Sequence, residues 1–295
     1  SAKTLLPNYD VFDESRYHYP LDIDKQSSSN ILIHSGKRIG ISICEDMWFS
    51  KNKEVYLKNP MNKFKNQNID IIVNISASPY ELGKDKNRKQ IISSIINDFK
   101  VPFVFVNQVG GNDGLVFDGG SGVFTDNSCF RLPYFCKSID SIDIDNLVIE
   151  KNSKFITSSL SEQNEAIESF PIISEPDLDN VLDALTLGIR DYVTKTGFST
   201  IVIGLSGGID SALTAYLAVR AMGPKNVVGV TMPSKFSSKG SVDDSYELAR
   251  NLGIKCSTIN IENMVDGVMG TLTPSFEGKK PDFTEENIQA RLRGV

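Results

Sequence analysis

The stretch Ile201-Val-Ile-Gly-Leu-Ser-Gly-Gly-Ile-Asp-Ser-Ala212 decides the fold of the second half of the chain. Residues 201–204 predict a buried strand, residues 206–211 a loop, and the apolar pattern of residues 212–222 a helix. This order suits phosphate binding, because the loop glycines let the backbone approach an anion and a helix N-terminus presents free N–H groups. The alternative is an ordinary strand-to-helix turn, which often carries glycine and serine.

Three side chains of this loop add to the same chemistry. Ser206 and Ser211 offer hydroxyl donors to a phosphate. Asp210 would repel a bare phosphate, so its expected partner is Mg²⁺ carried by a nucleotide. The loop has no lysine and does not match the G-x-x-x-x-G-K-[ST] pattern, which argues against a nucleotide site of the Walker type.

The composition is that of a globular protein with two domains. The chain has 295 residues, of which 40% are hydrophobic and 23% charged. A net charge of −6 argues against nucleic acid or an anionic membrane as the partner, and no apolar run is long enough to cross a membrane. Four widely spaced cysteines form no zinc or disulfide pattern, and no signal-peptide pattern is present, so a cytoplasmic location is expected. The first residue is not Met and the last residues fall in a predicted helix, so we expect a piece of a longer protein.

The first half alternates strands with helices, which predicts an α/β layered domain that ends near residue 148. The expected strands lie at residues 30–34, 38–43, 69–75, 101–107, 121–125 and 130–133, the last two as outer strands. The expected helices lie at residues 54–64 and 84–99, and the glycine-rich residues 110–114 predict a loop. The apolar runs at 69–75 and 101–107 are typical of strands buried on both faces.

Residues 149–178 are polar and predict a linker, so the second domain spans residues 179–295. The elements expected after the linker are a helix at 178–193 with Gly197 as its C-cap, strands at 226–232 and 255–261, and helices at 241–252 and 284–293. Residues 233–240 predict a loop at the carboxyl end of a parallel strand, the side where open α/β sheets bind ligands.

The chemistry of the first half is expected at Ile43-Cys-Glu-Asp-Met-Trp48. Cys44 follows a predicted strand at a turn that can display its side chain, and the alternative is a buried structural cysteine. The acids and aromatic residue that follow it weaken this alternative. With only two histidines in the chain a Cys–His pair is not expected, so a thiol nucleophile would need a carboxylate base and a cation beside the thiolate.

Several motifs, in this order, resemble known families. Lys3-Thr-Leu-Leu-Pro-Asn-Tyr9, Phe12-Asp-Glu-Ser-Arg16, the Cys44 motif and Asn74-Ile-Ser-Ala-Ser-Pro-Tyr80 resemble the nitrilase superfamily, which uses a Glu–Lys–Cys triad. The Ser206–Ser211 loop resembles the pyrophosphate loop of ATP pyrophosphatases. The combination resembles the family of glutamine-dependent NAD synthetases. It implies a nitrilase-like α-β-β-α domain at residues 1–148 without its N-terminal part, followed by a Rossmann-like parallel-sheet ATP pyrophosphatase domain without its C-terminal part.

The resemblance implies a ligase that activates deamido-NAD with ATP and amidates it with ammonia from glutamine. In this reading Cys44 is the nucleophile, Lys3 stabilises the thiolate and the oxyanion, Glu14 supports them, and the triad's glutamate base would precede Lys3. The residues implied for glutamine are Tyr9, Glu45, Trp48, Ser78 and Lys84. Those implied for ATP are Gly204, Leu205, Ser206, Gly207, Gly208, Ile209, Asp210, Ser211 and Met232, with Asp210 as the Mg²⁺ ligand. Asn287 and Arg291, which share a helix face, are implied for deamido-NAD, and Arg293 for phosphates.

Simpler interpretations stay open for three of these residues: Trp48 as core packing, Ser78 as a helix cap and Lys84 as a surface charge. Two other functions also stay open. One is another glutamine-dependent ligase with a pyrophosphatase loop, such as a GMP or asparagine synthetase. Those enzymes use a Cys–His–Glu site or an N-terminal Cys. The other is a nucleotide-binding or assembly module without turnover. The resemblance further implies small-molecule substrates and a homo-oligomer.

Overall fold

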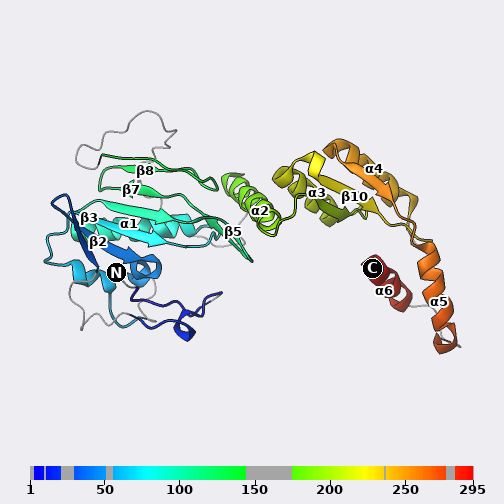
Figure 1. The fold of residues 1–295 in the computed structure, drawn as a ribbon, viewed down its shortest axis with the longest axis horizontal. Helices are drawn as coiled ribbons and strands as arrows, with labels where there is room; N and C mark the ends of the chain where they lie inside the picture. Colours follow the sequence, from blue (N-terminus) through cyan, green and yellow to red (C-terminus); the bar gives the residue numbers. More distant parts are fainter. Residues whose placement is uncertain are drawn as a thin grey trace. The chain divides into compact units, whose positions relative to one another are not determined.

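The computed structural model describes residues 3–9, 11–20, 30–50, 56–143, 175–235, 237–276 and 283–294. In this part of the chain no helix has both the length and the apolar character needed to span a bilayer. The chain divides into two compact units, Ser1–Ala184 and Leu185–Val295, and the division falls inside helix α2, Glu175–Lys195 (Figure 1). The predicted linker lies mostly outside the described residues, and α2 begins three residues before the predicted start at residue 178. The predicted domain limits stay a prediction.

A six-stranded mixed sheet forms the centre of the first unit, in the order β1-β2-β3-β4-β7-β8. Strands β2, β3 and β4 pair in parallel, and the outer pairs are antiparallel. The bounds are β1 Ile31–His34, β2 Lys37–Ile43, β3 Ile71–Ser76, β4 Phe103–Asn107, β7 Gly122–Phe124 and β8 Cys129–Arg131. All six lie where the sequence predicts strands.

Helix α1, Lys84–Phe99, has the predicted bounds and covers one face of this sheet (Figure 1). Its buried isoleucines recur at helical spacing and pack in one core with Phe103 and Phe105 of β4. Each such side chain contributes about 1.5–3 kcal/mol by leaving water. The helix therefore determines which face of the sheet is buried away from solvent.

The other face of the same strands is only partly covered. Ile72 is fully buried whereas Ile75 is 52% exposed, and Phe105 is buried whereas Val106 is 44% exposed. The prediction that these strands are buried on both faces is therefore wrong for the described residues. An apolar run shows that a strand is hydrophobic, but it does not show whether another layer of the structure covers both of its faces.

Two local predictions in the first unit are also wrong. Residues 110–114 are not a loop: β5, Val109–Asn112, pairs with β6, Leu115–Asp118, in a hairpin. The turn is Asp113-Gly114, with Asp113 at φ +50°, which is a known hairpin signal hidden by the neighbouring glycines. Within residues 56–64 only Pro60–Phe64 is helical, as a 3₁₀ helix η3, because Asn59 caps it by accepting from the Met61 N–H at 2.9 Å. Two more 3₁₀ helices are η1, Glu14–Arg16, and η2, Cys44–Ser50.

The second unit has a three-stranded parallel sheet in the order β11-β10-β9. Helices α3 and α4 both pack against β10, and their contacts form a separate apolar core (Figure 1). The bounds are β9 Ile201–Gly204, α3 Ile209–Met222, η4 Pro224–Asn226, β10 Val227–Thr231, α4 Lys239–Leu252, β11 Lys255–Thr258, α5 Glu262–Phe276 and α6 Phe283–Leu292. The parallel sheet confirms the predicted α/β class.

Three details of the second unit differ from the predictions. Helix α3 begins at Ile209, so Asp210 and Ser211 belong to its first turn and not to a loop. Strand β9 is buried on one face only, with Ile203 inside and Val202 67% exposed. Helix α5 was not predicted, because Gly267, Gly270 and Pro274 lower the helix propensity of its sequence.

Candidate active sites

Cys44 lies directly after β2, at the carboxyl end of a parallel strand. It is the first residue of η2 and has φ +44°, in the left-handed region that residues with a side chain seldom adopt. This sharp turn from strand to helix brings the thiol to a pocket of about 290 Å³. The carboxyl ends of parallel strands are where such sheets usually bind ligands.

This first pocket gathers residues that the sequence singles out from distant positions. The predicted residues that line it are Tyr9, Cys44, Glu45, Trp48, Ser78 and Lys84. The lining residues that were not predicted are Pro7, Phe12, Pro79, Glu81 and Asn87. Lys3 and Glu14 are not lining residues, but the Lys3 ammonium acts electrostatically on the Cys44 thiol.

The surroundings of Cys44 act on its pKa in opposite directions. Burial is the largest influence and raises the pKa of the thiol above its usual value. The Lys3 ammonium lowers this pKa, as do the Ala77 N–H and the Ser76 hydroxyl. Lys3 Nζ in turn donates to Glu14 Oε1 at 2.7 Å. The thiol is thus mainly protonated at rest and has a cation beside it that favours the thiolate.

Glu45 presents a fixed carboxylate in the same pocket. The residue is 4% exposed, and its carboxylate accepts from the Tyr9 hydroxyl at 2.9 Å and from the Tyr56 hydroxyl at 3.0 Å. Burial raises the pKa of Tyr56, and the Glu45 carboxylate raises it further, so this hydroxyl stays protonated and donates. A buried carboxylate held in this way is suited to bind an ammonium group.

Trp48 and Lys84 stand together on another side of this pocket. The Lys84 ammonium lies 5.7 Å from the centre of the Trp48 ring, within range of a cation–π contact. Trp48 also packs against the core below, which confirms its interpretation as core packing, and its role toward glutamine stays a prediction. The Lys84 side chain is 17% exposed, so its interpretation as a solvated surface charge is wrong.

Ser78 is held by a buried network that the sequence did not predict. The cap of α1 is Gly83, so the interpretation of Ser78 as a helix cap is wrong. Asn107 binds the Ser78 backbone from both sides: its Oδ1 accepts from the Ser78 N–H at 2.9 Å and its Nδ2 donates to the Ser78 carbonyl at 3.2 Å. Asn107 Nδ2 also donates to Asp118 Oδ1 at 2.9 Å, and Arg88 Nη1 donates to Asp118 Oδ2 at 3.1 Å. The signal in the sequence was the position of Asn107, as the last residue of a predicted strand beside the ligand edge.

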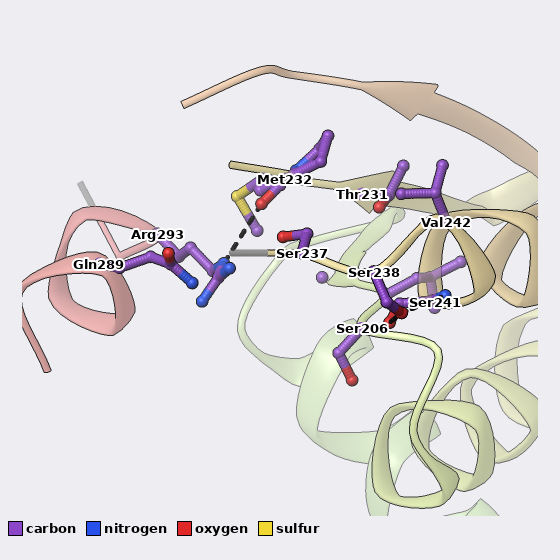
Figure 2. Close-up of a pocket in the computed structure, with 12 residues that line it drawn as sticks. Ser206, Thr231, Met232, Ser237, Ser238, Ser241, Val242, Gln289 and Arg293 are labelled. Atoms are coloured by element: carbon purple, nitrogen blue, oxygen red, sulfur yellow. Dashed lines mark hydrogen bonds between the residues drawn. The ribbon is translucent and has the colours of Figure 1, made fainter. Parts of the chain in front are cut away.

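A second pocket, of about 460 Å³, lies after β9 and β10 in the second unit (Figure 2). Four of the predicted ATP residues line it: Gly204, Leu205, Ser206 and Met232. Arg293, which the resemblance implies for phosphates, also lines it. The other lining residues were not singled out as ATP residues: Thr231, Pro233, Ser237, Ser238, Ser241, Val242 and Gln289. Figure 2 shows Gln289 of α6 and Arg293, directly after this helix, reaching in, while Ser206, Ser238 and Ser241 lie close together.

The glycine loop has a tight geometry around Ser206. Ser206 Oγ accepts from the Gly208 N–H at 3.3 Å and lies 3.1 Å from Ser211 Oγ. Gly207 has φ +78°, and a Cβ there would lie 2.7 Å from the backbone of Ser241. The remaining predicted residues of the loop, Gly207, Gly208, Ile209, Asp210 and Ser211, follow Ser206 and are not lining residues.

The N-terminus of α4 and the loop that leads into α3 meet at this pocket. Ser206 lies in that loop, and Ser238 is the N-cap of α4, where its Oγ accepts from the Ser241 N–H at 3.1 Å. Helix N-termini carry a partial positive charge and unpaired N–H groups. A pocket at such a terminus, lined by hydroxyl groups, is suited to an anion such as a phosphate.

Helix α6 presents a different face to the pocket from the one predicted. Asn287 and Arg291 are exposed, whereas Arg293 Nε donates to the Met232 carbonyl at 3.3 Å. When the Gln289 amide is oriented to donate to Ser234 Oγ at 2.6 Å, its oxygen accepts from Arg293 Nη2 at 2.6 Å. A step of two residues turns a helix by about 200°, so Gln289 and Arg293 lie on a face nearly opposite that of Asn287 and Arg291. Roles of Asn287 and Arg291 toward deamido-NAD stay a prediction.

Asp210 is the single predicted metal ligand. Among the described residues no group of three or more His, Cys, Asp or Glu side chains is arranged to hold a metal ion. Asp210 is exposed in the first turn of α3. One carboxylate together with phosphate oxygens is a common way to bind Mg²⁺, so this residue fits an ion that a nucleotide brings with it.

Comparisons with known proteins find relatives over nearly the whole chain. Residues 181–295 match the family model described as NAD synthase. The glutamine-dependent NAD(+) synthetase of a Synechocystis species is 40% identical over 299 residues, which cover 99% of this chain and 50% of that protein. The corresponding protein of Thermotoga maritima is 38% identical over 315 residues, which cover 99% of this chain and 52% of that protein.

A solved structure is similar as well. The glutamine-dependent NAD+ synthetase of Acinetobacter baumannii, solved in complex with ADP, has a TM-score of 0.79 and 35% identity. The match covers 99% of this chain and 51% of that one. The chain thus spans about half the length of the relatives that it matches.

Proposed function

Because this chain is a homologue of the glutamine-dependent NAD synthetases over 99% of its length, we propose that its protein makes NAD from deamido-NAD, ATP and the amide nitrogen of glutamine. The reaction divides between the two pockets. The first would release ammonia from glutamine, and the second would activate the nicotinate carboxylate with ATP.

In the first pocket the Cys44 thiolate attacks the side-chain amide carbon of glutamine. Ammonia leaves, a thioester forms on the sulfur, and water then releases glutamate. The Lys3 ammonium, which lowers the pKa of Cys44, would stabilise the thiolate and the oxyanion, and the Glu45 N–H is a further candidate donor. The Glu45 carboxylate suits the α-ammonium group of glutamine, and the Lys84 ammonium suits its α-carboxylate.

In the second pocket the nicotinate carboxylate of deamido-NAD attacks the α-phosphate of ATP. This gives an adenylate and pyrophosphate, and ammonia then displaces AMP to form NAD. The N-terminus of α4, the loop that leads into α3 and the hydroxyls of Ser206, Ser238 and Ser241 would bind the phosphates. When bound, Mg²⁺ held by Asp210 and the nucleotide would offset phosphate charge.

One observation carries this proposal: the residues that the family resemblance implies for glutamine line a single pocket around Cys44. A packed structural cysteine would not need these charged and aromatic neighbours around an open space. The binding of ADP by the A. baumannii relative supports a nucleotide in the second pocket.

The test is NAD formation by the purified protein, driven either by glutamine or by ammonium chloride. Cys44→Ala is expected to abolish the glutamine-driven reaction and to leave the ammonia-driven reaction unchanged. Equal loss of both reactions would contradict separate sites. Binding of ATP with no AMP formed would instead favour the nucleotide-binding or assembly module. A homo-oligomer in the cytoplasm is a further prediction, which light scattering of the protein and its localisation in cells would test.

A further inference from the structure

Asp46 joins the two catalytic segments of the first pocket. The residue is completely buried and lies two positions after Cys44 in η2. Its Oδ1 accepts from the N–H groups of both Thr4 and Leu5, each at 2.9 Å. Its Oδ2 accepts from the Ile43 N–H at 3.3 Å. One carboxylate therefore holds the backbone next to Lys3 and the backbone next to Cys44.

A carboxylate suits this place better than an amide, whose NH2 group could not accept the bond from the Ile43 N–H. Three backbone N–H groups converge on Asp46, and an ionised carboxylate accepts hydrogen bonds at both oxygens without donating any. Thr4, Leu5 and Leu6 are all buried, so their backbone cannot exchange these bonds for water without leaving its place.

The position of Lys3 depends on few other polar contacts. Its ammonium is bound to Glu14, which lies on a 3₁₀ helix outside the sheet. Lys3 and the turn that bears Cys44 lie in different segments of the chain and share no helix or strand. The Asp46 carboxylate links the two backbones by hydrogen bonds to both.

We propose that Asp46 is a positioning residue that holds the Lys3 ammonium beside the Cys44 thiol. Asp46 is not one of the residues that line the pocket, and it acts through Lys3. This inference rests on the proposed roles of Lys3 and Cys44. It adds a requirement that the reaction scheme does not contain: the lysine works only while this carboxylate fixes the segment that carries it.

The consequence can be measured on the thiol itself. The charged groups that act on Cys44 are Lys3 and Glu45, and Lys63 faces Asp46 from η3. If Asp46 acted on the thiol directly, removing its negative charge would lower the pKa of Cys44. If it acts through Lys3, removing it releases the ammonium and raises this pKa. The two possibilities differ in sign.

The experiment is the pH profile of iodoacetamide alkylation of Cys44, followed by mass spectrometry of the peptide that contains it. Asp46→Asn is expected to raise the midpoint by about one pH unit, which lowers the rate near neutral pH about tenfold. Lys3→Met should raise the midpoint similarly, and the double variant should show no further rise. Asp70→Asn is the matched control, because Asp70 Oδ2 also accepts a backbone N–H, from Arg38, on the exposed surface and should leave the profile unchanged.

A lower or unchanged midpoint in folded Asp46→Asn would overturn the proposal, and so would additive shifts in the double variant. If Asp46→Asn does not fold, Thr4→Pro removes one donor and keeps the carboxylate, and the same rise is expected; an unchanged midpoint again overturns the proposal. Alkylation requires no glutamine turnover. Failure here is therefore distinct from failure of the proposed function, which the Cys44→Ala comparison reveals.

Discussion

The Cys44 thiol has a raised pKa because it is buried, and Lys3 only partly offsets this. Below this pKa the thiolate fraction increases tenfold per pH unit, so alkylation should keep rising above the usual thiol range. At pH 7 we expect the exposed Cys136 to react well before Cys44. Peptide-resolved mass spectrometry after timed alkylation measures both rates. A Cys44 rate that reaches its plateau near neutral pH would contradict a raised pKa.

Gly207 is the loop position where a side chain should be least tolerated. Alanine there would adopt φ +78° and bring its Cβ to 2.7 Å from the Ser241 backbone, so α4 or the loop must move. We expect Gly207→Ala to weaken ATP binding at least tenfold, measured by calorimetry. That loss corresponds to about 1.4 kcal/mol.

Gly197→Ala is the matched control for this change. Gly197 has φ +85° but open space around it, so only backbone strain is added. The expected result is a loss of about 1–2 kcal/mol in stability with ATP affinity unchanged. Equal ATP affinities of the two variants would contradict a role of the close approach between Gly207 and Ser241 in ATP binding.

At the scale of elements, the buried pair of Arg88 and Asp118 joins helix α1 to the β5–β6 hairpin. Both side chains are almost completely inaccessible, and Arg88 also lies over the Phe105 ring at 4.9 Å. Arg88→Met leaves the Asp118 charge buried with its main partner removed, so we expect a loss of about 3–5 kcal/mol. Urea unfolding measures this loss.

Two further variants test whether the buried, unpaired charge causes this loss of stability. Arg88→Met combined with Asp118→Asn should recover part of the stability, because no unpaired charge remains and Asn107 can still donate to the new amide. Arg16→Met removes an exposed ion pair with Asp13 and should cost less than about 1 kcal/mol. Similar losses for Arg88→Met and Arg16→Met would mean that burial of the pair contributes nothing.

Elements were predictable where a local pattern decides them. Helix α1 and strand β9 have the predicted bounds because apolar spacing and flanking breakers lie within each segment. The β5–β6 hairpin was missed because its strand residues include Gly110 and Gly111, whose low strand propensity is overridden by pairing with β6. The inward face of α6 was missed because charge spacing gives a helix period but not its rotation toward a partner.

At the scale of the whole chain, each unit has its own apolar core. Ile72 belongs to the first core and Ile254 to the second, and both are buried. Substitution of either by alanine should cost about 2–5 kcal/mol. Calorimetry should show that Ile72→Ala lowers one melting transition and Ile254→Ala the other, with excess ATP raising only the second. A common shift of both transitions in either variant would contradict this.

The sites were predictable to the extent that motifs carry them. Cys44 and the glycine loop lie in continuous motifs, so the sequence alone located each of them. Asn107 and Asp46 act by contacts with residues far away in the sequence, such as Asp46 with Thr4, 42 positions away, and such contacts exist only after folding. Sequence reasoning therefore identified reacting groups better than the groups that orient them.

The left-handed backbone of Cys44 has a consequence for selection. Glycine adopts φ +44° without the steric cost that a Cβ brings, so Gly at this position would relax the turn while removing the thiol. Stability and reactivity thus favour different residues at one codon. In a population selected only for thermal resistance and not for the reactivity of the thiol, position 44 would be among the first to lose its cysteine, and the pocket would persist as a cavity without that thiol.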